Sequence, residues 1–361
     1  MLDHLKEEGQ VVLVVNDTYM DIDVMCDAIV QSSINAKEIR RCTFGPKDKG
    51  DFATIQLELE TNGPENIAIG DEIYEQIEDA DVLFIHFCPV SEKLLEKAKH
   101  LKLIMTNRGG VEHINVPAAS KRNIPVVNCI RNAEAVCEFA IGLMIDLSRD
   151  ISLANRSLHE GGWQREFYNT SFQRTLSNSK VGLIGLGNVG CLLARKLLAL
   201  GVEVLAYDAF TDEEMLKKKR IGEVKLCKNV DDLLKEADFV SLHLRLVKET
   251  ENWFDMDKIR KMKKTAYLLN TARGGILDYD DLRIALKEGY IAGAALDVFD
   301  HEPPVEDDPL KQMDNVVMTS HLGGTTLDSF GLSPYLAAKD VTAIIEEDVT
   351  ERIVNLKQIT I

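Results

Sequence analysis

The chain has 361 residues, of which 45% are hydrophobic, and this length favours two domains over a single core. Its 42 basic and 59 acidic residues give a formal net charge of −17, which argues against nucleic acids and anionic membrane surfaces as partners. The seven cysteines form no CxxC pair and the polar start is unlike a signal peptide, so we expect a cytoplasmic protein with reduced thiols, no metal site and no membrane span.

Short apolar runs followed by helical patterns fill the first third of the chain. Four of these runs are expected to be strands, at residues 11–15, 81–87, 102–106 and 125–128. Strand–helix alternation indicates a parallel sheet that is covered by helices on both faces.

A long helical pattern then spans residues 132–159 and is rich in apolar side chains such as Val136, Phe139 and Leu143. It is longer than one crossover between strands requires, so part of its apolar face is available to a second copy of the chain. A plain core helix and a dimer-forming helix fit the pattern equally well.

A second block of strand–helix alternation begins near residue 180. Its expected strands lie at 181–184, 203–207, 239–244, 266–270, 293–296 and 316–319. Because this block opens with its own glycine fingerprint, we expect two separate sheets. The tail from 326 to 347 is again helical, interrupted by Gly331 and Pro334, and is expected to pack back on the first domain.

The glycine fingerprint is Gly185-Leu-Gly187-Asn-Val-Gly190, between a predicted buried strand and a predicted helix over 188–200. Gly185 permits the tight turn, Gly187 lets the backbone approach a pyrophosphate, and Gly190 lets helix and strand pack closely. The pyrophosphate would lie over the N–H groups and the positive dipole end of that helix. Although such glycines also mark ordinary turns, this context predicts dinucleotide binding.

Asp208 ends the next predicted strand, about 20 residues past the glycines. A carboxylate at this place accepts hydrogen bonds from both ribose hydroxyls and repels a 2′-phosphate. The sequence therefore predicts NAD rather than NADP as the cofactor.

Polar groups follow three later strands, at the carboxyl ends where open α/β sheets bind ligands. Hydride chemistry on a 2-hydroxy acid needs a cation for the carboxylate, a base near neutral pKa, and an acid that fixes the tautomer of this base. Arg273, His321 and Glu302 supply these types in three consecutive loops, although each alone also fits a surface or turn residue.

These segments resemble the D-2-hydroxyacid dehydrogenase family over residues 101–326. The likeness is carried by GLGNVG, Asn-Thr-Ala-Arg-Gly-Gly, Leu-Asp-Val-Phe followed by Glu-Pro, and His-Leu-Gly-Gly, in this order and spacing. The resemblance implies that Arg273 binds the substrate carboxylate and carbonyl oxygen and that His321 is the acid/base. It also implies that Glu302 hydrogen-bonds the imidazole and raises its pKa.

The resemblance also assigns residues to the cofactor. Asp297 is implied to contact the nicotinamide carboxamide, and Asn188 and Val189 match backbone positions at the pyrophosphate. Further matches to cofactor-binding loops are Leu244, Thr271, Gly323 and Gly324. One departure is His243-Leu-Arg245 in place of the usual His-x-Pro, which predicts a looser or more basic loop there.

The segment Asn107-Arg108-Gly109-Gly110-Val-Glu-His-Ile-Asn115 resembles the substrate loop of the family. Its backbone N–H groups are implied to cradle the substrate carboxylate as an anion nest. Arg108 is then a second cation for the substrate, and a solvated loop arginine is the open alternative.

The family fold implies two Rossmann-like α/β domains, each a parallel sheet with helices on both faces. A flavodoxin-like substrate domain comprises residues 1–128 and 327–361, and an NAD-binding Rossmann domain over 129–326 is inserted into it. Crossings near Asn128 and Thr326 are implied to let the cleft close over substrate. The long helix corresponds to an element that family members use to dimerise, so we expect a homodimer through the NAD-binding domain.

We therefore expect an NAD-dependent enzyme that interconverts a small D-2-hydroxy acid and its 2-keto acid. Phosphoglycerate oxidation is an alternative, but His86 stands where that enzyme class places a phosphate-binding arginine, and an end at Ile361 leaves no room for a regulatory domain. Formate dehydrogenases replace the residue that matches Glu302, which argues against that reaction. A corepressor-like NAD(H)-sensing scaffold is disfavoured because no disordered or basic segment is appended.

Overall fold

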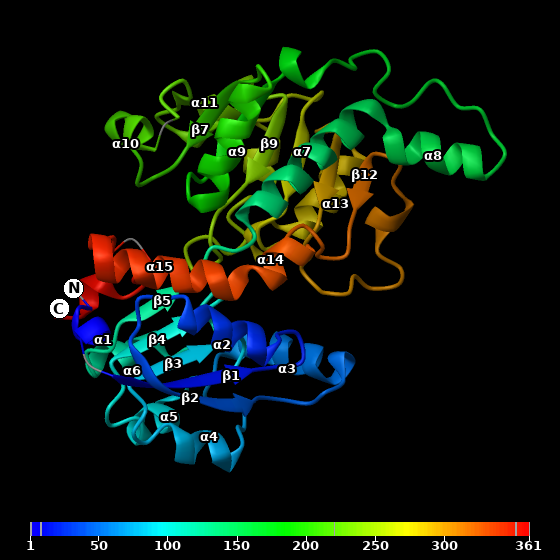
Figure 1. The fold of residues 1–361 in the computed structure, drawn as a ribbon. Coiled ribbons are helices and arrows are strands. Elements are labelled where there is room, and N and C mark those ends of the chain that lie inside the picture. Colours follow the sequence, from blue (N-terminus) through cyan, green and yellow to red (C-terminus); the bar gives the residue numbers. More distant parts are fainter. Residues whose placement is uncertain (1, 8, 220, 351, 361) are drawn as a thin grey trace. The chain divides into compact units, whose positions relative to one another are not determined.

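The structure, a computed structural model, describes residues 2–7, 9–219, 221–350 and 352–360. The chain divides into two compact units, one formed by Met1–Asn132 with Thr326–Ile361 and the other by Ala133–Thr325. These limits lie within a few residues of the predicted domain bounds. Each unit is an all-parallel sheet flanked by helices, as predicted for the fold class (Figure 1).

The sheet of the first unit has the flavodoxin-like order β2-β1-β3-β4-β5. Its strands are β1 (Gln10–Asn16), β2 (Ala36–Thr43), β3 (Val82–Ile85), β4 (Leu103–Thr106) and β5 (Val126–Asn128). The chain runs from β1 outward to β2 and returns on the other side of β1 to form β3, so the topological switch point lies between β1 and β3. The sequence predicts four of these strands and misses β2, a charged edge strand.

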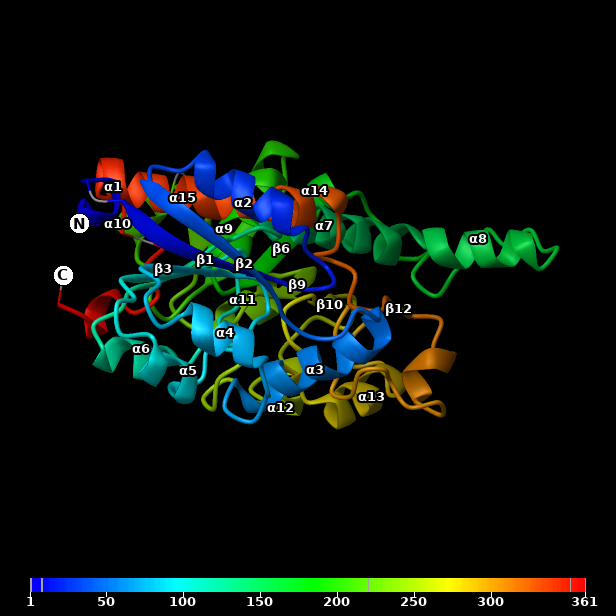
Figure 2. The ribbon, with the colours of Figure 1, turned by 60° about the horizontal axis from the view of Figure 1, so that its bottom comes forward.

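Two apolar cores lie on opposite faces of this sheet, because alternate residues of a strand point to opposite sides. Leu13 and Val15 of β1 face one core, and Val12 and Val14 face the other. Helices α2 and α15 cover one face and α4 and α5 the other (Figure 2). The helical segments of this unit are α1 (His4–Glu7), α2 (Ile22–Val30), α3 (Lys49–Asn62), α4 (Asp71–Gln76), α5 (Glu92–Lys97), α6 (Val116–Lys121), α14 (Leu327–Gly331), α15 (Ser333–Glu347) and η4 (Leu356–Gln358).

The C-terminal tail belongs to the first unit, as predicted. Helix α15 packs against α2 and buries Ala337, Val341 and Ile344 in the same core as β1 and β3. Pro334 lies in the first turn of α15, where proline is tolerated because its missing N–H has no helical partner there.

The sheet of the second unit has seven strands in the order β12-β11-β10-β9-β6-β7-β8. They are β6 (Lys180–Ile184), β7 (Glu203–Tyr207), β8 (Lys225–Leu226), β9 (Phe239–Leu242), β10 (Tyr267–Asn270), β11 (Gly293–Leu296) and β12 (Val316–Met318). This is the doubly wound Rossmann arrangement, with its switch point between β6 and β9. The sequence predicts six of these strands and misses β8, which has only two residues.

The prediction of one helix over 132–159 is wrong. Asp150 adopts a left-handed φ of 54°, which ends α7 (Ala133–Arg149) and starts α8 (Ile151–His159). Aspartate tolerates this conformation better than most residues, and Asp146 accepts a hydrogen bond from the Ser152 N–H across the break. Helix α7 buries one face against α9 in the core, whereas α8 buries no residue.

The remaining helical segments connect the strands of the second unit. They are α9 (Asn188–Ala199), α10 (Glu213–Lys218), α11 (Val230–Glu236), α12 (Met256–Ile259), α13 (Tyr279–Lys287), η1 (Leu176–Asn178), η2 (Gly274–Ile276) and η3 (Pro309–Gln312). Among the described residues, no helix combines the length and the apolar character that crossing a membrane requires. All seven cysteines are buried free thiols.

Candidate active site

The turn between β6 and α9 requires two of its three glycines for reasons of protein packing. Gly185 has a φ of +100°, and a Cβ on it would lie 2.5 Å from the carbonyl oxygen of His243. A Cβ on Gly190 would lie 2.1 Å from the carbonyl oxygen of Gly185, so only glycine lets α9 pack this closely on the strand. A Cβ on Gly187, by contrast, would meet no atom of the described residues within 4 Å. Packing among the described residues therefore does not explain Gly187.

Helix α9 begins at Asn188, with Gly187 as its N-cap. Asn188 and Val189 thus occupy the first turn, whose N–H groups point along the helix axis past its end. This end lies at the switch point between β6 and β9, where open α/β sheets bind their ligands. The arrangement suits an anionic group such as a pyrophosphate.

Asp208 follows β7 directly and is fixed beside the glycine turn. Its carboxylate accepts hydrogen bonds from the N–H groups of Leu186, at 2.7 Å, and Phe210, at 2.8 Å. Each oxygen keeps a further lone pair for a ribose hydroxyl. The side chain of Leu244 lies against the same turn, 3.2 Å from the Cβ position of Gly185.

Arg273 lies in the loop after β10, and its side chain is exposed. The Asn270 side chain holds this loop, since its Oδ1 accepts from the Ala272 N–H at 3.1 Å and its Nδ2 donates to the Arg273 carbonyl at 3.0 Å. A Cβ on Gly274 would lie 1.8 Å from the Phe299 carbonyl oxygen, so the residue after Arg273 has to be glycine. The guanidinium is therefore carried on a loop of fixed shape.

Thr271 precedes this arginine and is almost completely buried. Its hydroxyl has no hydrogen-bond partner in the part of the chain that the structure describes. A buried hydroxyl is normally paired, so this atom is available to a ligand in the predicted cofactor loop.

His321 and Glu302 form a hydrogen-bonded couple. The Nδ1 atom of His321 lies 2.7 Å from Oε2 of Glu302, and Oε1 of Glu302 accepts from the Phe299 N–H at 3.0 Å. A carboxylate only accepts hydrogen bonds, so Nδ1 carries the proton and Nε2 is the atom that exchanges one. His321 has a left-handed φ of 55°, a conformation that costs free energy in a histidine and occurs most often at functional sites.

Electrostatics within the second unit tune this couple. The hydrogen bond that His321 donates to Glu302 raises the pKa of His321, whereas burial and the charge of Arg273 lower it. Burial acts to raise the pKa of Glu302, but the hydrogen bond and charge of His321 outweigh it and the pKa falls below its usual value. Arg273 influences both groups, so the structure brings together the three residues predicted to be catalytic.

Asp297 shapes the loop that carries the histidine. Its carboxylate accepts from the Thr319 hydroxyl at 2.6 Å and from the N–H groups of Leu322 and Gly323 at 2.8 Å. Its carbonyl oxygen accepts from the His321 N–H at 2.9 Å. Asp297 is thus a positioning residue for His321. This role comes in addition to the contact with the nicotinamide carboxamide that the family resemblance implies for Asp297.

Sequence reasoning missed Asn270 and Thr319, which hold the loops of Arg273 and His321. Asn270 ends β10 and Thr319 directly follows β12, and an Asn at the end of a strand commonly hydrogen-bonds the backbone two residues on. An Asn at the end of a predicted strand was therefore the sequence feature from which the loop contact of Asn270 could have been predicted.

The predicted substrate loop Arg108-Gly109-Gly110 belongs to the first unit, after β4. Arg108 is only 7% exposed, donates to Glu60 at 2.9 Å and stacks 3.3 Å above the ring of Phe87. The alternative of a solvated loop arginine is therefore wrong. Gly109 accepts a hydrogen bond from the Asn128 side chain through its carbonyl oxygen, at 2.6 Å.

Comparison with known proteins identifies the family. Residues 141–323 match the profile described as D-isomer specific 2-hydroxyacid dehydrogenase, NAD binding domain. The chain belongs to this family. The dehydrogenase therefore has NAD as its cofactor, and the matched residues lie in the second unit.

Relatives of known sequence carry several names. The dehydrogenase is 36% identical to a glyoxylate reductase of Thermofilum pendens, over 79% of this chain and 84% of that protein. It is also 36% identical to a D-3-phosphoglycerate dehydrogenase of Methanocaldococcus jannaschii, over 83% of this chain. The match covers 57% of that second relative, so the chain spans little more than half its length.

Solved structures share the fold. The D-lactate dehydrogenase of Aquifex aeolicus, solved with NAD and lactic acid, is 25% identical, with a TM-score of 0.67 over 94% of this chain and 98% of that one. The NAD-complexed D-isomer specific 2-hydroxyacid dehydrogenase of Lactobacillus delbrueckii ssp. bulgaricus has a TM-score of 0.71 over 95% and 100% of the two chains, at 24% identity.

Proposed function

We propose that this dehydrogenase transfers a hydride between NAD(H) and C2 of a small D-2-hydroxy acid, with Arg273, His321 and Glu302 as its catalytic residues. The observation that carries the proposal is the His321–Glu302 couple, fixed by the Phe299 N–H and lying within electrostatic reach of Arg273. A surface histidine and glutamate would need neither this fixed geometry nor the strained backbone at His321.

The residues of the second unit fit the cofactor. Gly187 leaves open space at the start of α9, Asp208 offers fixed acceptors beside it, and the Thr271 hydroxyl lacks a partner among the described residues. Asn188, Val189, Leu244, Gly323 and Gly324 complete the proposed contacts. When bound, NAD accepts the hydride in oxidation and NADH supplies it in reduction.

His321 moves the proton at its Nε2 atom. In oxidation the neutral imidazole takes the proton of the substrate hydroxyl, and in reduction the imidazolium returns it to the forming alkoxide. Glu302 favours the imidazolium and holds its Nδ1–H, so the ring stays in one tautomer and orientation. General acid–base catalysis of this kind contributes about 10²–10⁴-fold to the rate.

Arg273 binds and orients the substrate. Its planar guanidinium can hold a carboxylate with two parallel hydrogen bonds, which a lysine cannot reproduce. The fixed loop between Asn270 and Gly274 limits how far this group can move. Arg108, Gly109 and Gly110 of the first unit are proposed as further substrate contacts.

We propose an unphosphorylated substrate. His86 stands where a phosphate-binding arginine is expected in phosphoglycerate dehydrogenases, and it is completely buried against Asp17. Because several relatives are named D-3-phosphoglycerate dehydrogenase, the test has to include the phosphorylated acid as well.

The test is a panel of 2-keto acids assayed with NADH, comprising glyoxylate, pyruvate, hydroxypyruvate and 3-phosphohydroxypyruvate. We expect turnover of an unphosphorylated acid to a product of D configuration, identified by chiral chromatography. An L product, or no NADH oxidation with any of the four acids, would refute the proposal. A kcat/KM highest for 3-phosphohydroxypyruvate would favour the phosphoglycerate alternative.

We also propose that the dehydrogenase is a cytoplasmic homodimer through its NAD-binding domain. Seven unpaired thiols favour a reducing compartment. Apolar side chains on and after α8 are exposed in the single chain, with Ile151 at 53%, Leu158 at 56% and Trp163 at 79%. Large apolar side chains that are exposed in a single chain commonly become buried in subunit contacts.

A further inference from the structure

We propose that Lys219 is a positioning residue of the cofactor site, because its ammonium group holds the glycine turn between β6 and α9. The inference rests on the proposed role of this turn in binding the pyrophosphate of NAD. It adds a residue that belongs neither to the glycine fingerprint nor to the segments that carry the family resemblance.

Leu186 is the middle residue of this turn, and charged side chains bind both of its backbone polar groups. Its N–H donates to Oδ2 of Asp208 at 2.7 Å, and its carbonyl oxygen accepts from Nζ of Lys219 at 2.9 Å. Hydrogen bonds that involve an ionised group are about twice as strong as those between neutral groups. The peptide units before and after Leu186 are therefore fixed by a carboxylate and an ammonium.

The peptide unit after Leu186 also carries the N–H of Gly187, which is the N-cap of α9. A peptide unit is planar, and in its trans form the N–H points away from the carbonyl oxygen. By holding the Leu186 oxygen, Lys219 thus sets the direction of the Gly187 N–H, which donates to no described residue. This donor lies at the helix end where the pyrophosphate is proposed to bind.

The thiol of Cys191, in the first turn of α9, is a second donor to the same carbonyl. Its Sγ lies 2.9 Å from the Leu186 oxygen. Burial raises the pKa of this thiol, so it stays protonated and donates. Because the carbonyl keeps this donor when the ammonium is removed, we expect Lys219 variants to fold with a less strictly oriented Gly187 N–H.

The connection between β7 and β8 holds Lys219 at this place. Asp208 opens the connection, and Lys219 is the C-cap of its helix α10. Leu216 of α10 is buried in the core of the second unit, which anchors the helix. The N–H of Lys219 donates to the Met215 carbonyl at 2.9 Å, so the backbone of the lysine is fixed as well.

The ammonium also places a positive charge beside the turn. The charges of Lys219 and Asp208 act in opposite directions on the thiol of Cys191, so both groups lie near the start of α9. The carboxylate alone would repel the two negative charges of the pyrophosphate, and a nearby cation offsets this repulsion. Asp208 can then accept from the ribose hydroxyls at a smaller electrostatic cost.

The two preceding lysines show how an ordinary surface lysine behaves in α10. Lys218 is exposed and pairs with the exposed Glu214 at 3.0 Å, a contact that contributes little to stability. Lys217 is exposed too. Lys219 is half-buried and donates to the backbone of the proposed cofactor turn, which a solvated lysine would not do.

The experiment is fluorescence titration of the full-length protein with NADH, without substrate. Lys219→Met should weaken NADH binding about tenfold, since a hydrogen bond to a charged group and its charge are lost together. Lys219→Arg keeps a cationic donor and should restore part of the affinity, and Lys217→Met is the matched control that should bind as the wild type does. Wild-type NADH affinity in a folded Lys219→Met protein would overturn the inference.

Thermal unfolding distinguishes positioning from a merely structural role. Without cofactor, Lys219→Met should melt close to the wild-type temperature, and saturating NADH should raise its melting temperature by less than it raises that of the wild type. A lower melting temperature together with an undiminished rise on adding NADH would mean that Lys219 only stabilises the fold, and the inference would fail.

Kinetics separate this inference from the proposed function. With the best keto acid of the panel, Lys219→Met should raise the KM for NADH and leave kcat nearly unchanged, because the catalytic residues are intact. A reduced kcat with unchanged NADH affinity would contradict the positioning role. If the wild type turns over no keto acid but binds NADH in a manner that depends on Lys219, only the proposed function fails.

Discussion

At the scale of single residues, the proposed chemistry depends on how Glu302 holds His321. The hydrogen bond at 2.7 Å fixes the tautomer, and the same carboxylate raises the pKa of the imidazole. The Phe299 N–H holds the other carboxylate oxygen, so Glu302 cannot rotate freely. In the proposed mechanism, reduction requires the protonated imidazole, and the raised pKa extends the pH range over which this form is populated.

The pH profile of the reductive reaction tests this coupling. For the wild type, kcat/KM with a keto acid and NADH should fall as the pH rises through the pKa of His321. Glu302→Gln removes the charge that raises this pKa, so the descending limb should move to lower pH and the rate should fall at least tenfold. A limb that stays at the same pH in Glu302→Gln would contradict this role for Glu302.

Two glycines of the β6–α9 turn can be substituted to distinguish a packing role from a cofactor-binding role. Gly190→Ala places a Cβ 2.1 Å from a carbonyl oxygen and should destabilise the fold by about 1–3 kcal/mol. Gly187→Ala meets no described atom within 4 Å, so it should leave the melting temperature unchanged but weaken NADH binding. Thermal unfolding and NADH fluorescence titration measure the two effects. Unchanged NADH affinity in Gly187→Ala would remove the cofactor explanation for this glycine.

At the scale of elements, the residues proposed to bind ligands follow the ends of strands. The sequence predicts some of these strands more clearly than others. Strands β9, β10 and β11 are fully buried and read as short apolar runs, so their ends and the loops after them are predictable. Strand β2 has mostly charged or exposed residues because it lies at a sheet edge, and only its pairing with β1 makes it a strand. The sequence also does not reveal that the helix ends at Asp150, since the helical spacing of apolar residues continues past this position.

We predict that Asp208, which follows β7 directly, discriminates between NADH and NADPH. Its carboxylate would repel a 2′-phosphate, so the wild type should prefer NADH to NADPH. Asp208→Ala should reduce this preference at least tenfold, measured as the ratio of kcat/KM for the two cofactors. Because Asp208 also holds the Leu186 N–H, Asp208→Asn is the control that keeps an acceptor without the charge. An unchanged ratio in Asp208→Ala would mean that another group discriminates.

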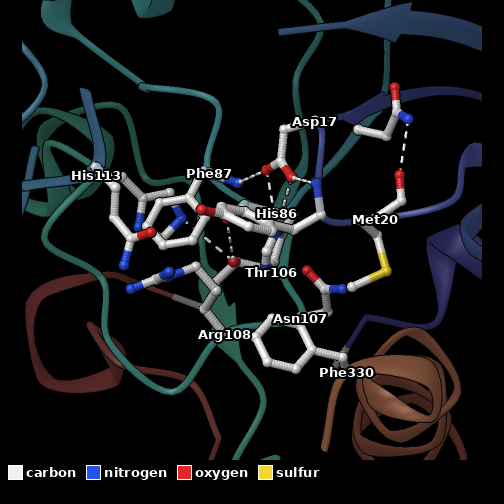
Figure 3. Close-up of polar contacts among 12 residues, drawn as sticks. Asp17, Met20, His86, Phe87, Thr106, Asn107, Arg108, His113 and Phe330 are labelled. Atoms are coloured by element: carbon white, nitrogen blue, oxygen red, sulfur yellow. Dashed lines mark hydrogen bonds and ion pairs between the residues drawn. The ribbon is translucent and has the colours of Figure 1, made fainter. Parts of the chain in front are cut away.

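At the scale of the whole molecule, the structure has the two all-parallel α/β sheets that the sequence predicts. Sequence reasoning could not predict the buried contact between Asp17 and His86 in the first unit (Figure 3). Asp17 and His86 are far apart in sequence and become partners only when β1 and β3 pair. The role of Asp297 in holding the His321 loop was likewise set by long-range hydrogen bonds. Local patterns do not encode such contacts.

The quaternary structure is tested by light scattering after size exclusion. The wild type should have twice the mass of one chain, whereas Leu158→Glu, which puts a charge among the exposed apolar residues after α7, should yield monomers. Leu57→Glu, at an exposed leucine of α3 in the first unit, is the matched control and should remain dimeric. A monomeric wild type would refute the dimer.

The most direct test of the central claim is the turnover of triad variants with the best keto acid of the panel and NADH. His321→Ala should lower kcat by about 10²–10⁴-fold, and Arg273→Ala should lower kcat/KM by a comparable factor because it loses both orientation and charge stabilisation. His301→Ala, an exposed histidine beside Glu302, should match the wild type. Folded His321→Ala and Arg273→Ala proteins with wild-type turnover would show that these residues do not carry the reaction.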